Sequence, residues 1–283
     1  MSRRKSFSGA RCLVTGASSG LGRAIAEELV KAGSNVLLTG RSIDRLDQVA
    51  THLVASGASP DAVTRIAADL TLERGREEVL RLARDRFGAL DIVVNAAGVG
   101  ATGHFDTHEP EIFRSIFEIN VFALVEMTRM SLPLLRRGVR PSLVNLGSIV
   151  ARRALPGRPE YSSSKFAVAG FTESIRAEWS KYGIHVLLLN PGFTKTEFEQ
   201  NLLVNTARVP TSQKRVMTAK KVAEHTLKAI RRGHHELTLT TEGQLLLFIN
   251  RLAPRIVDAG FAFFTRRVFR DVVRSSWEVS REE

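Results

Sequence analysis

Short apolar runs alternate along the chain with segments in which apolar residues recur every three or four positions. The runs predict strands that are buried on both faces, and the periodic segments predict helices. Strands are expected at 11–15, 35–40, 63–68, 91–98 with its exit loop, 142–148, 184–192 with the loop that follows, and 236–240. Helices are expected at 21–33, 42–56, 73–87, 110–136, 160–182 and 218–233.

The alternation of strands and helices predicts an α/β fold, a Rossmann-type doubly wound sheet of about seven parallel strands with helices on both faces. Residues 9–241 are expected to form one domain, because no linker or internal repeat divides them. Residues 242–283 are expected to form an amphipathic helical C-terminal extension. A hydrophobic fraction of 43% and a charged fraction of 25% agree with a soluble globular protein.

The segment "TGASSGLG" (15–22) follows the first expected strand and opens the first expected helix. Gly16 allows a tight turn, Gly20 allows the main chain to approach a phosphate, and Gly22 allows the helix to pack close to the sheet. The helix N-terminus offers free N–H groups to an anion. The loop therefore predicts a dinucleotide site. Its other expected members are Ser18, Ser19 and Leu21.

The segment "YSSSK" places Tyr161 and Lys165 four residues apart, on one face of the expected helix. Lowering the pKa of a tyrosine from about 10 to about 7 requires roughly 4 kcal/mol. An ammonium group about 4 Å away supplies that much at an effective dielectric constant of about 20. The pair therefore predicts that Lys165 makes Tyr161 a usable acid near neutral pH. Ser148 ends the preceding strand, where ligands of open α/β sheets bind.

Together, the G-x-x-x-G-x-G loop, the segment "NAAG" (95–98) and "YSSSK" resemble the short-chain dehydrogenase/reductase family over residues 9–240. The resemblance implies hydride transfer between a ketone or aldehyde and an alcohol, with Tyr161 as the acid or base. It implies that Ser148 binds the substrate oxygen and that Lys165 also holds the nicotinamide ribose. It further implies that Asn120 holds a water of a proton relay, although an ordinary polar residue inside a helix is the alternative.

The resemblance also implies which nucleotide binds. Arg41 stands after the second expected strand, where an acidic residue would select NAD. A guanidinium suits a 2′-phosphate by its charge and its forked donors, so Arg41, with Ser42 as a helper, predicts NADP(H). Two observations leave the choice between NADP(H) and NAD(H) open. Ser19 stands where many NADP enzymes carry a basic residue, and Arg41 would also suit a solvated loop.

Other nucleotide contacts follow from the same resemblance. Asp69 is expected to meet the adenine amino group, with Leu70 beside it, and a helix cap or turn is the alternative role for Asp69. The expected contacts to the two riboses and the nicotinamide are Tyr161, Lys165, Asn95, Ala96, Ala97, Gly98, Pro191, Gly192 and Thr194. Residues 196–217 are polar and irregular, and are expected to form a mobile substrate lid.

The C-terminal segment 243–275 has two apolar helical patterns separated at Pro254, and 251–274 carries six Arg and two Asp. Such a basic, aromatic-rich segment predicts contact with a membrane interface, cover for the substrate cleft or a subunit contact, and all three remain open. Each of them favours a lipophilic substrate, such as a fatty, steroid-like or sphingoid ketone.

Charge and composition exclude other classes of protein. The net charge of +12 is spread along the chain without a nucleic-acid-binding signature, so nucleic acid is not an expected partner. The single cysteine, Cys12, excludes an intramolecular disulfide. The seven histidines are expected in loops and at the surface, without a metal. No signal peptide or transmembrane run is evident, so a cytoplasmic protein is expected, and peripheral membrane contact through 243–275 stays one of the open alternatives.

The sequence therefore predicts an NADP(H)-dependent oxidoreductase for a lipophilic carbonyl substrate, assembled as a homodimer or homotetramer through 110–136 and 160–182. The alternative is a non-catalytic NADP-binding regulator or a membrane-associated scaffold. The set of Asn120, Ser148, Tyr161 and Lys165 disfavours that alternative, because a sensor needs no proton relay. A sugar-nucleotide epimerase would show a G-x-x-G-x-x-G loop and a larger C-terminal domain, which this sequence lacks.

Overall fold

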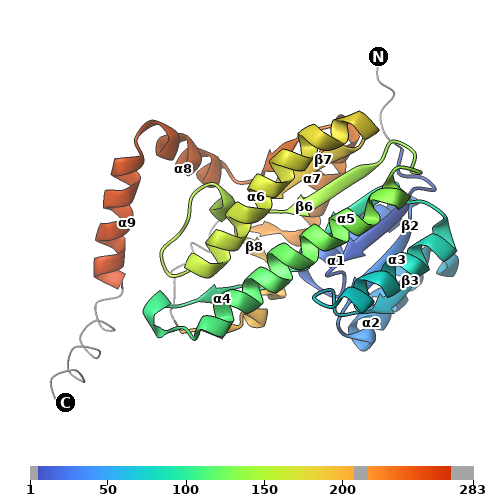
Figure 1. Cartoon of the computed structure of the whole chain (residues 1–283), viewed down its shortest axis with the longest axis horizontal. Coiled ribbons are helices and arrows are strands. Elements are labelled where there is room, and N and C mark those ends of the chain that lie inside the picture. The colour runs from blue at the N-terminus through green and yellow to red at the C-terminus, as the bar shows by residue number, and fades with distance from the viewer. Residues whose placement is uncertain (1–5, 207–215, 269–283) are drawn as a thin grey trace.

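A single parallel sheet organises the chain (Figure 1), in a computed structural model that describes residues 6–206 and 216–268. Its seven strands lie in the order β11-β7-β6-β4-β1-β2-β3, and every neighbouring pair is parallel. The strands are β1 (Arg11–Thr15), β2 (Asn35–Gly40), β3 (Val63–Ala67), β4 (Ile92–Asn95), β6 (Ser142–Leu146), β7 (His185–Asn190) and β11 (Glu236–Thr238). The predicted fold class is confirmed.

Helices cover both faces of this sheet (Figure 1). They are α1 (Gly20–Lys31), α2 (Ile43–Ala55), α3 (Glu73–Phe87), α4 (Pro110–Phe117), α5 (Ala123–Leu135), α6 (Pro159–Trp179) and α7 (Ala219–Arg232), followed by α8 (Thr241–Leu252) and α9 (Pro254–Val268). Two short parallel pairs lie apart from the sheet, β8 (Thr194–Lys195) with β10 (Met217–Thr218) and β5 (Ala101–Thr102) with β9 (Val204–Asn205).

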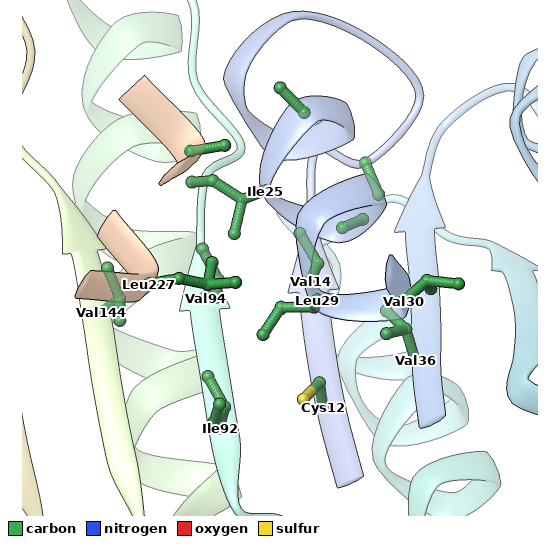
Figure 2. Close-up of a cluster of buried hydrophobic side chains, with 14 of the residues drawn as sticks. Cys12, Val14, Ile25, Leu29, Val30, Val36, Ile92, Val94, Val144 and Leu227 are labelled. Atoms are coloured by element: carbon green, nitrogen blue, oxygen red, sulfur yellow. The ribbon is translucent and has the colours of Figure 1, made fainter. Parts of the chain in front are cut away.

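Alternate residues of each strand supply two separate cores, because successive side chains point to opposite faces of a sheet. Cys12 of β1 packs with Ile25 of α1 in one core, which Figure 2 shows. Leu13, the next residue, packs with Met127 of α5 and Trp179 of α6 in the other core. Burial on both faces explains why central strands such as β4 and β7 are mostly apolar.

The strand order creates a switch point beside β1. The chain builds β1, β2 and β3 outward in one direction and then returns to place β4 on the other side of β1. The connections that leave β1 and β4 therefore diverge, and a crevice forms beyond the carboxyl ends of these two strands. The glycine-rich loop 15–22 leaves β1 at this point.

The helix predicted at 110–136 is interrupted. A π-helical turn, Glu118–Phe122, separates α4 from α5. One extra residue in a turn hardly changes the apolar periodicity, so the pattern predicted one continuous helix. The turn contains Asn120, and π-turns inside α-helices often occur at functional sites.

The two C-terminal helical patterns are α8 and α9, and they separate at Pro254 as predicted. No helix in the described parts of the chain is long and apolar enough to cross a membrane. Two predictions fall partly outside the described residues: positions 207–215 of the expected lid and positions 269–283 of the expected amphipathic C-terminal extension.

Candidate active site

A cavity of about 1260 Å³ lies at the carboxyl ends of the central strands. This volume exceeds that of a pocket for one drug-sized ligand and leaves room for a dinucleotide together with a substrate. The predicted site residues that line it are Gly16, Ser18, Ser19, Gly20, Leu21, Gly22, Arg41, Asp69, Leu70, Ala96, Ala97, Gly98, Ser148, Tyr161, Lys165, Pro191, Gly192 and Thr194. Of the predicted set, Ser42, Asn95 and Asn120 are not among the residues that line it.

The loops after β1 and β4 meet at the floor of the cavity. Thr15 accepts hydrogen bonds on its Oγ1 from the main-chain N–H groups of Ala96 (3.0 Å) and Ala97 (3.1 Å). A Cβ at Gly16 would stand 2.8 Å from the Cα of Ala97, and the φ of Gly16 is +63°. Only glycine fits this crossing. Thr15 was missed by the sequence analysis, because its partners lie 81 and 82 residues away.

The N-terminus of α1 opens into the cavity. Ser19 occupies the N-cap position but makes no side-chain capping hydrogen bond, and the first turn carries no acidic residue. The unpaired N–H groups and the partial positive charge of this helix end therefore face the cavity. Such an end binds a phosphate group.

A pair of arginines borders the adenosine side of the cavity. Arg41 is exposed and lines it, and Arg45, one turn further along α2, lines it as well. Arg45 forms an ion pair with Glu197. Ser42 is the N-cap of α2, and its hydroxyl accepts the N–H of Arg45 at 3.4 Å, so this side chain serves the helix. The sequence did not lead us to Arg45 as a cavity residue, although its position four residues after Arg41 could have indicated that it lies nearby.

Two predicted nucleotide residues have clear partners within the protein. Asp69 lines the cavity, and its Oδ1 accepts hydrogen bonds from the N–H and the hydroxyl of Thr71 at 3.0 and 2.7 Å. This is the turn role that the sequence left open. Asn95 is buried, and its Nδ2 donates to Thr128 and Asn145, each at 2.9 Å. The Asn95 side chain therefore joins β4 to α5 and β6.

Tyr161, Ser148 and Lys165 share one end of the cavity. The Tyr161 hydroxyl is hydrogen-bonded to Ser148. The Lys165 ammonium is buried, lies 5.7 Å from the centroid of the Tyr161 ring, and donates to the main-chain oxygen of Leu146 at 2.7 Å. Burial lowers the pKa of Lys165 to about 8.

The pKa of Tyr161 is raised, and its main cause is burial of the phenol. The hydrogen bond with Ser148 and the positive charge of Arg158 oppose this rise without cancelling it. The prediction that Tyr161 has a pKa near neutrality is therefore wrong for the folded chain. That prediction counted the attraction of the ammonium but left out the desolvation of the phenolate, which acts in the opposite direction.

Asn120 lies beneath this group, fully buried in the π-turn. Its Nδ2 donates to the main-chain oxygen of Val99 and to the hydroxyl of Ser164, each at 2.9 Å, and its Oδ1 accepts the N–H of Val99 at 2.8 Å. Ser164 in turn donates to the main-chain oxygen of Tyr161 at 2.8 Å. The side chain thus joins the exit of β4 to the helix that carries Tyr161, and its role in a proton relay stays a prediction.

An ion pair beside Tyr161 was not found from the sequence. Arg158 lines the cavity with a side chain that is 8% exposed, and it donates to Glu199 at 2.9 Å. The sequence feature that could have indicated Arg158 as a neighbour of the site is its position one helical turn before Tyr161. Glu199 lies 41 residues away, in the 3₁₀ turn Glu197–Asn201, so no local pattern links the two.

A second unforeseen pair lies outside the cavity. His108 Nδ1 and Glu160 Oε1 are 2.7 Å apart, and both side chains are almost completely buried. Of the expectation that the histidines lie in loops and at the surface, the loop position is confirmed for His108, but the surface position is wrong because its side chain is buried. The contact anchors the segment before α4 on the first turn of α6, next to Tyr161.

Apolar side chains also line the cavity beside the Arg158–Glu199 ion pair. Phe198, from the described part of the expected lid, packs on the Tyr161 ring with centroids 5.4 Å apart. Helix α8 contributes Gly243 and Leu246 to the wall, so the C-terminal segment does border the cleft. Other large apolar residues that line the cavity include Ile149, Val150, Leu155 and Phe193.

Comparisons with known proteins agree with this geometry. The family model described as short chain dehydrogenase matches residues 10–206. A Dictyostelium discoideum protein named dehydrogenase/reductase SDR family protein 7-like is 30% identical over 251 residues, which cover 87% of this chain and 78% of that protein.

Two solved structures share the fold. A short-chain dehydrogenase/reductase from Burkholderia phymatum, in complex with NAD, has a TM-score of 0.80 at 23% identity, with 89% of this chain and 96% of that one covered. An alcohol dehydrogenase from the archaeon Thermococcus sibiricus, complexed with 5-hydroxy-NADP, has a TM-score of 0.71 at 26% identity, with 81% and 94% covered.

Proposed function

This chain belongs to the short-chain dehydrogenase/reductase family, and on that premise we propose that it is an NADP(H)-dependent oxidoreductase. Its reaction interconverts a lipophilic ketone or aldehyde and the corresponding alcohol. One observation carries the proposal: Tyr161, Ser148 and the buried Lys165 line the same cavity as the N-terminus of α1.

The residues around the loop 15–22 fit a dinucleotide. The uncapped start of α1 suits a pyrophosphate by charge and by free N–H groups. A Cβ at Gly16 would collide with the main chain of Ala97. Glycine therefore allows the loops after β1 and β4 to lie against each other at the floor of the cavity. Asp69 and the loop 96–98 would hold the adenosine half, and Pro191, Gly192 and Thr194 the nicotinamide half. When bound, the nicotinamide supplies the hydride for the carbonyl carbon.

The side chains of the chain itself act on the substrate oxygen. Tyr161 holds its proton at neutral pH, because burial raises its pKa, and it donates that proton from Oη to the developing alkoxide. Ser148 donates a hydrogen bond from Oγ to the same oxygen and orients it. The buried charge of Lys165 stabilises the phenolate that remains. Oxidation of an alcohol uses the same groups in reverse.

The preference for NADP(H) rests on Arg41 and Arg45. Both line the cavity, and Arg41 follows β2 where an acidic residue would repel a 2′-phosphate. Arg45 is held by Glu197, which leaves Arg41 as the main candidate for the phosphate. The related structures carry NAD in one case and an NADP derivative in the other. The proposed preference for NADP(H) over NAD(H) therefore depends on the two arginines.

The lipophilic substrate class rests on the wall around Tyr161. The ring of Phe198 lies on the phenol, and further large apolar side chains line the same cavity, together with the Arg158–Glu199 ion pair. Removing apolar surface from water there favours an apolar ligand by about 25 cal/mol for each Å² buried.

The test is oxidation of NADPH, followed by its absorbance, with a panel of long-chain, steroid-like and small polar ketones. We expect turnover with the lipophilic members and a higher kcat/KM with NADPH than with NADH. Binding of NADPH without turnover of any ketone would instead favour a non-catalytic regulator. Turnover of only the small polar ketones would contradict the lipophilic substrate class but would still support the oxidoreductase reaction.

A further inference from the structure

Helices α8 and α9 carry large apolar side chains that the rest of the described chain leaves uncovered. Leu252 and Ile256 are each 69% exposed, and Phe263 is 68% exposed. Residues three, four or seven positions apart share one face of a helix, so these side chains form a stripe along each helix. The members of this exposed stripe are Leu245, Phe248, Ile249, Leu252, Ile256 and Phe263.

The opposite face of α9 is attached to the body of the protein. Val257 is buried, and Phe261 lies under the guanidinium of Arg153, which is 5.0 Å from the ring centroid. Arg153 also donates to Asp258 at 2.5 Å. These contacts hold α9 by one face at the outer end of the molecule (Figure 1), and the exposed stripe occupies the other face.

Positive charge accompanies the stripe. Residues 243–268 contain four arginines and one carboxylate, and that carboxylate, Asp258, is already paired with Arg153. The arginines are Arg251, Arg255, Arg266 and Arg267. Arginine stems cover apolar surface while their heads reach a polar layer, which suits the boundary between the acyl chains and the headgroups of a bilayer.

We propose that the exposed stripe and its four arginines dock the protein on an anionic lipid bilayer. A bilayer supplies apolar and negatively charged partners together, whereas a second copy of this chain would set the same arginines against one another. Within the described residues neither α8 nor α9 is long and apolar enough to cross a bilayer, so the two helices lie in its interface.

The position of α8 connects this surface to the cavity. Leu245 belongs to the stripe, while Gly243 and Leu246 of the same helix line the cavity. If the proposed reaction is correct, a lipophilic substrate reaches Tyr161 directly from the bilayer. The docking itself does not depend on the reaction and is measured without cofactor or substrate.

The experiment is co-sedimentation of the full chain with vesicles of phosphatidylcholine, with and without phosphatidylglycerol. We expect wild-type protein to bind the anionic vesicles at least about 100-fold more tightly than the neutral ones. The double variant I256S/F263S should bind the anionic vesicles at least about 30-fold more weakly, because two large side chains no longer enter the lipid. R255Q/R266Q should lose about 30-fold on anionic vesicles and little on neutral ones.

Val139→Ser is the matched control, because Val139 is equally exposed (69%) but follows α5, away from the stripe. It should bind as wild type does. Urea midpoints of all variants confirm that they fold. Equal binding by wild type and I256S/F263S would overturn the proposal. A lipid-free dimer that I256S/F263S dissociates would also overturn it and assign the stripe to a second copy of the chain.

Discussion

The ammonium nitrogen of Lys165 lies 5.7 Å from the centroid of the Tyr161 ring, and it donates to the main-chain oxygen of Leu146. A buried positive charge thus stands beside a phenol whose pKa is raised by its own burial. The phenol keeps its proton at neutral pH, and the nearby charge lowers the free energy needed to form the phenolate. Such a pair suits the proposed delivery of a proton to a substrate.

Replacing Tyr161 by phenylalanine removes that proton and leaves the ring in place. We expect turnover of a ketone to fall by about 10²–10⁴-fold, the usual contribution of a positioned acid. Affinity for NADPH, measured by fluorescence titration, should change less than about twofold, because the phosphates bind elsewhere. Tyr182→Phe is the control, since Tyr182 packs under Arg136 at 4.8 Å, outside the cavity. Normal turnover by Y161F would remove Tyr161 from the reaction.

The pH dependence of ketone reduction should report Lys165. Its pKa is lowered to about 8 by burial, so the side chain loses its charge as the pH rises through that value. We expect kcat/KM to fall above pH ~8, because the neutral amine no longer stabilises the phenolate. In Lys165→Arg the charge persists to higher pH, and the fall should disappear from this range even if the rate is lower throughout. Lys181→Arg should keep the wild-type profile. An unchanged profile in K165R would contradict the assignment.

Arg41→Ala should raise KM for NADPH by about 10- to 100-fold, the loss expected for hydrogen bonds to a charged group. KM for NADH should change little, and Arg41→Asp should widen the difference between the two cofactors. The measurement is steady-state kinetics with each cofactor. Arg74→Asp, on an 87% exposed side chain of α3, makes the same charge change away from the cavity. Equal losses for NADPH and NADH in R41D would rule out 2′-phosphate recognition.

Gly22 and Gly170 should respond in opposite directions to alanine. A Cβ at Gly22 would overlap the main-chain oxygen of Gly16, so G22A should lower the free energy of unfolding by about 1–3 kcal/mol and weaken NADPH binding. Gly170 lies within α6 with no atom near its added Cβ, so G170A should raise the free energy of unfolding by about 0.5–1 kcal/mol. Urea unfolding measures both. A neutral G22A would show that the first turn of α1 can move away from β1.

Asp91 makes stability depend on pH. Burial raises its pKa, but the hydrogen bonds from Arg11 and from the N–H of Val139 outweigh that effect, so the pKa of Asp91 is lowered. Its contribution is therefore complete above the unfolded pKa of about 3.9 and disappears as the pH falls through the lower folded value. Asp91→Asn should lower the free energy of unfolding by about 2–3 kcal/mol at neutral pH.

Urea unfolding of D91N and wild type from neutral to acid pH tests this, and the two stabilities should converge toward the acid end. Asp85→Asn is the control, because Asp85 pairs with Arg84 at 3.5 Å on the surface with 60% of its side chain exposed. Exposed pairs of this kind contribute about 0–1 kcal/mol. A constant difference between D91N and wild type at every pH would exclude the titration of Asp91 as its cause.

The sequence by itself determined the features that depend on neighbours along the chain. Apolar runs and helical periods predicted the seven strands and the two-sided sheet, because burial on both faces leaves a continuous apolar run. The glycine loop was predicted because a strand, a turn and a helix follow one another without interruption. Tyr161 and Lys165 were placed on one face of one helix by their spacing of four residues.

The tertiary structure decided everything that depends on residues far apart. It brought Glu199 to Arg158 and Thr15 to the loop after β4, and it enclosed Asn120 among protein partners. It also set the direction of the Tyr161 pKa shift. The physical reason is that burial is a property of the whole fold. A spacing of four residues is enough to place an ammonium near a phenol on one helix. Only the packed chain determines how strongly that phenol is desolvated.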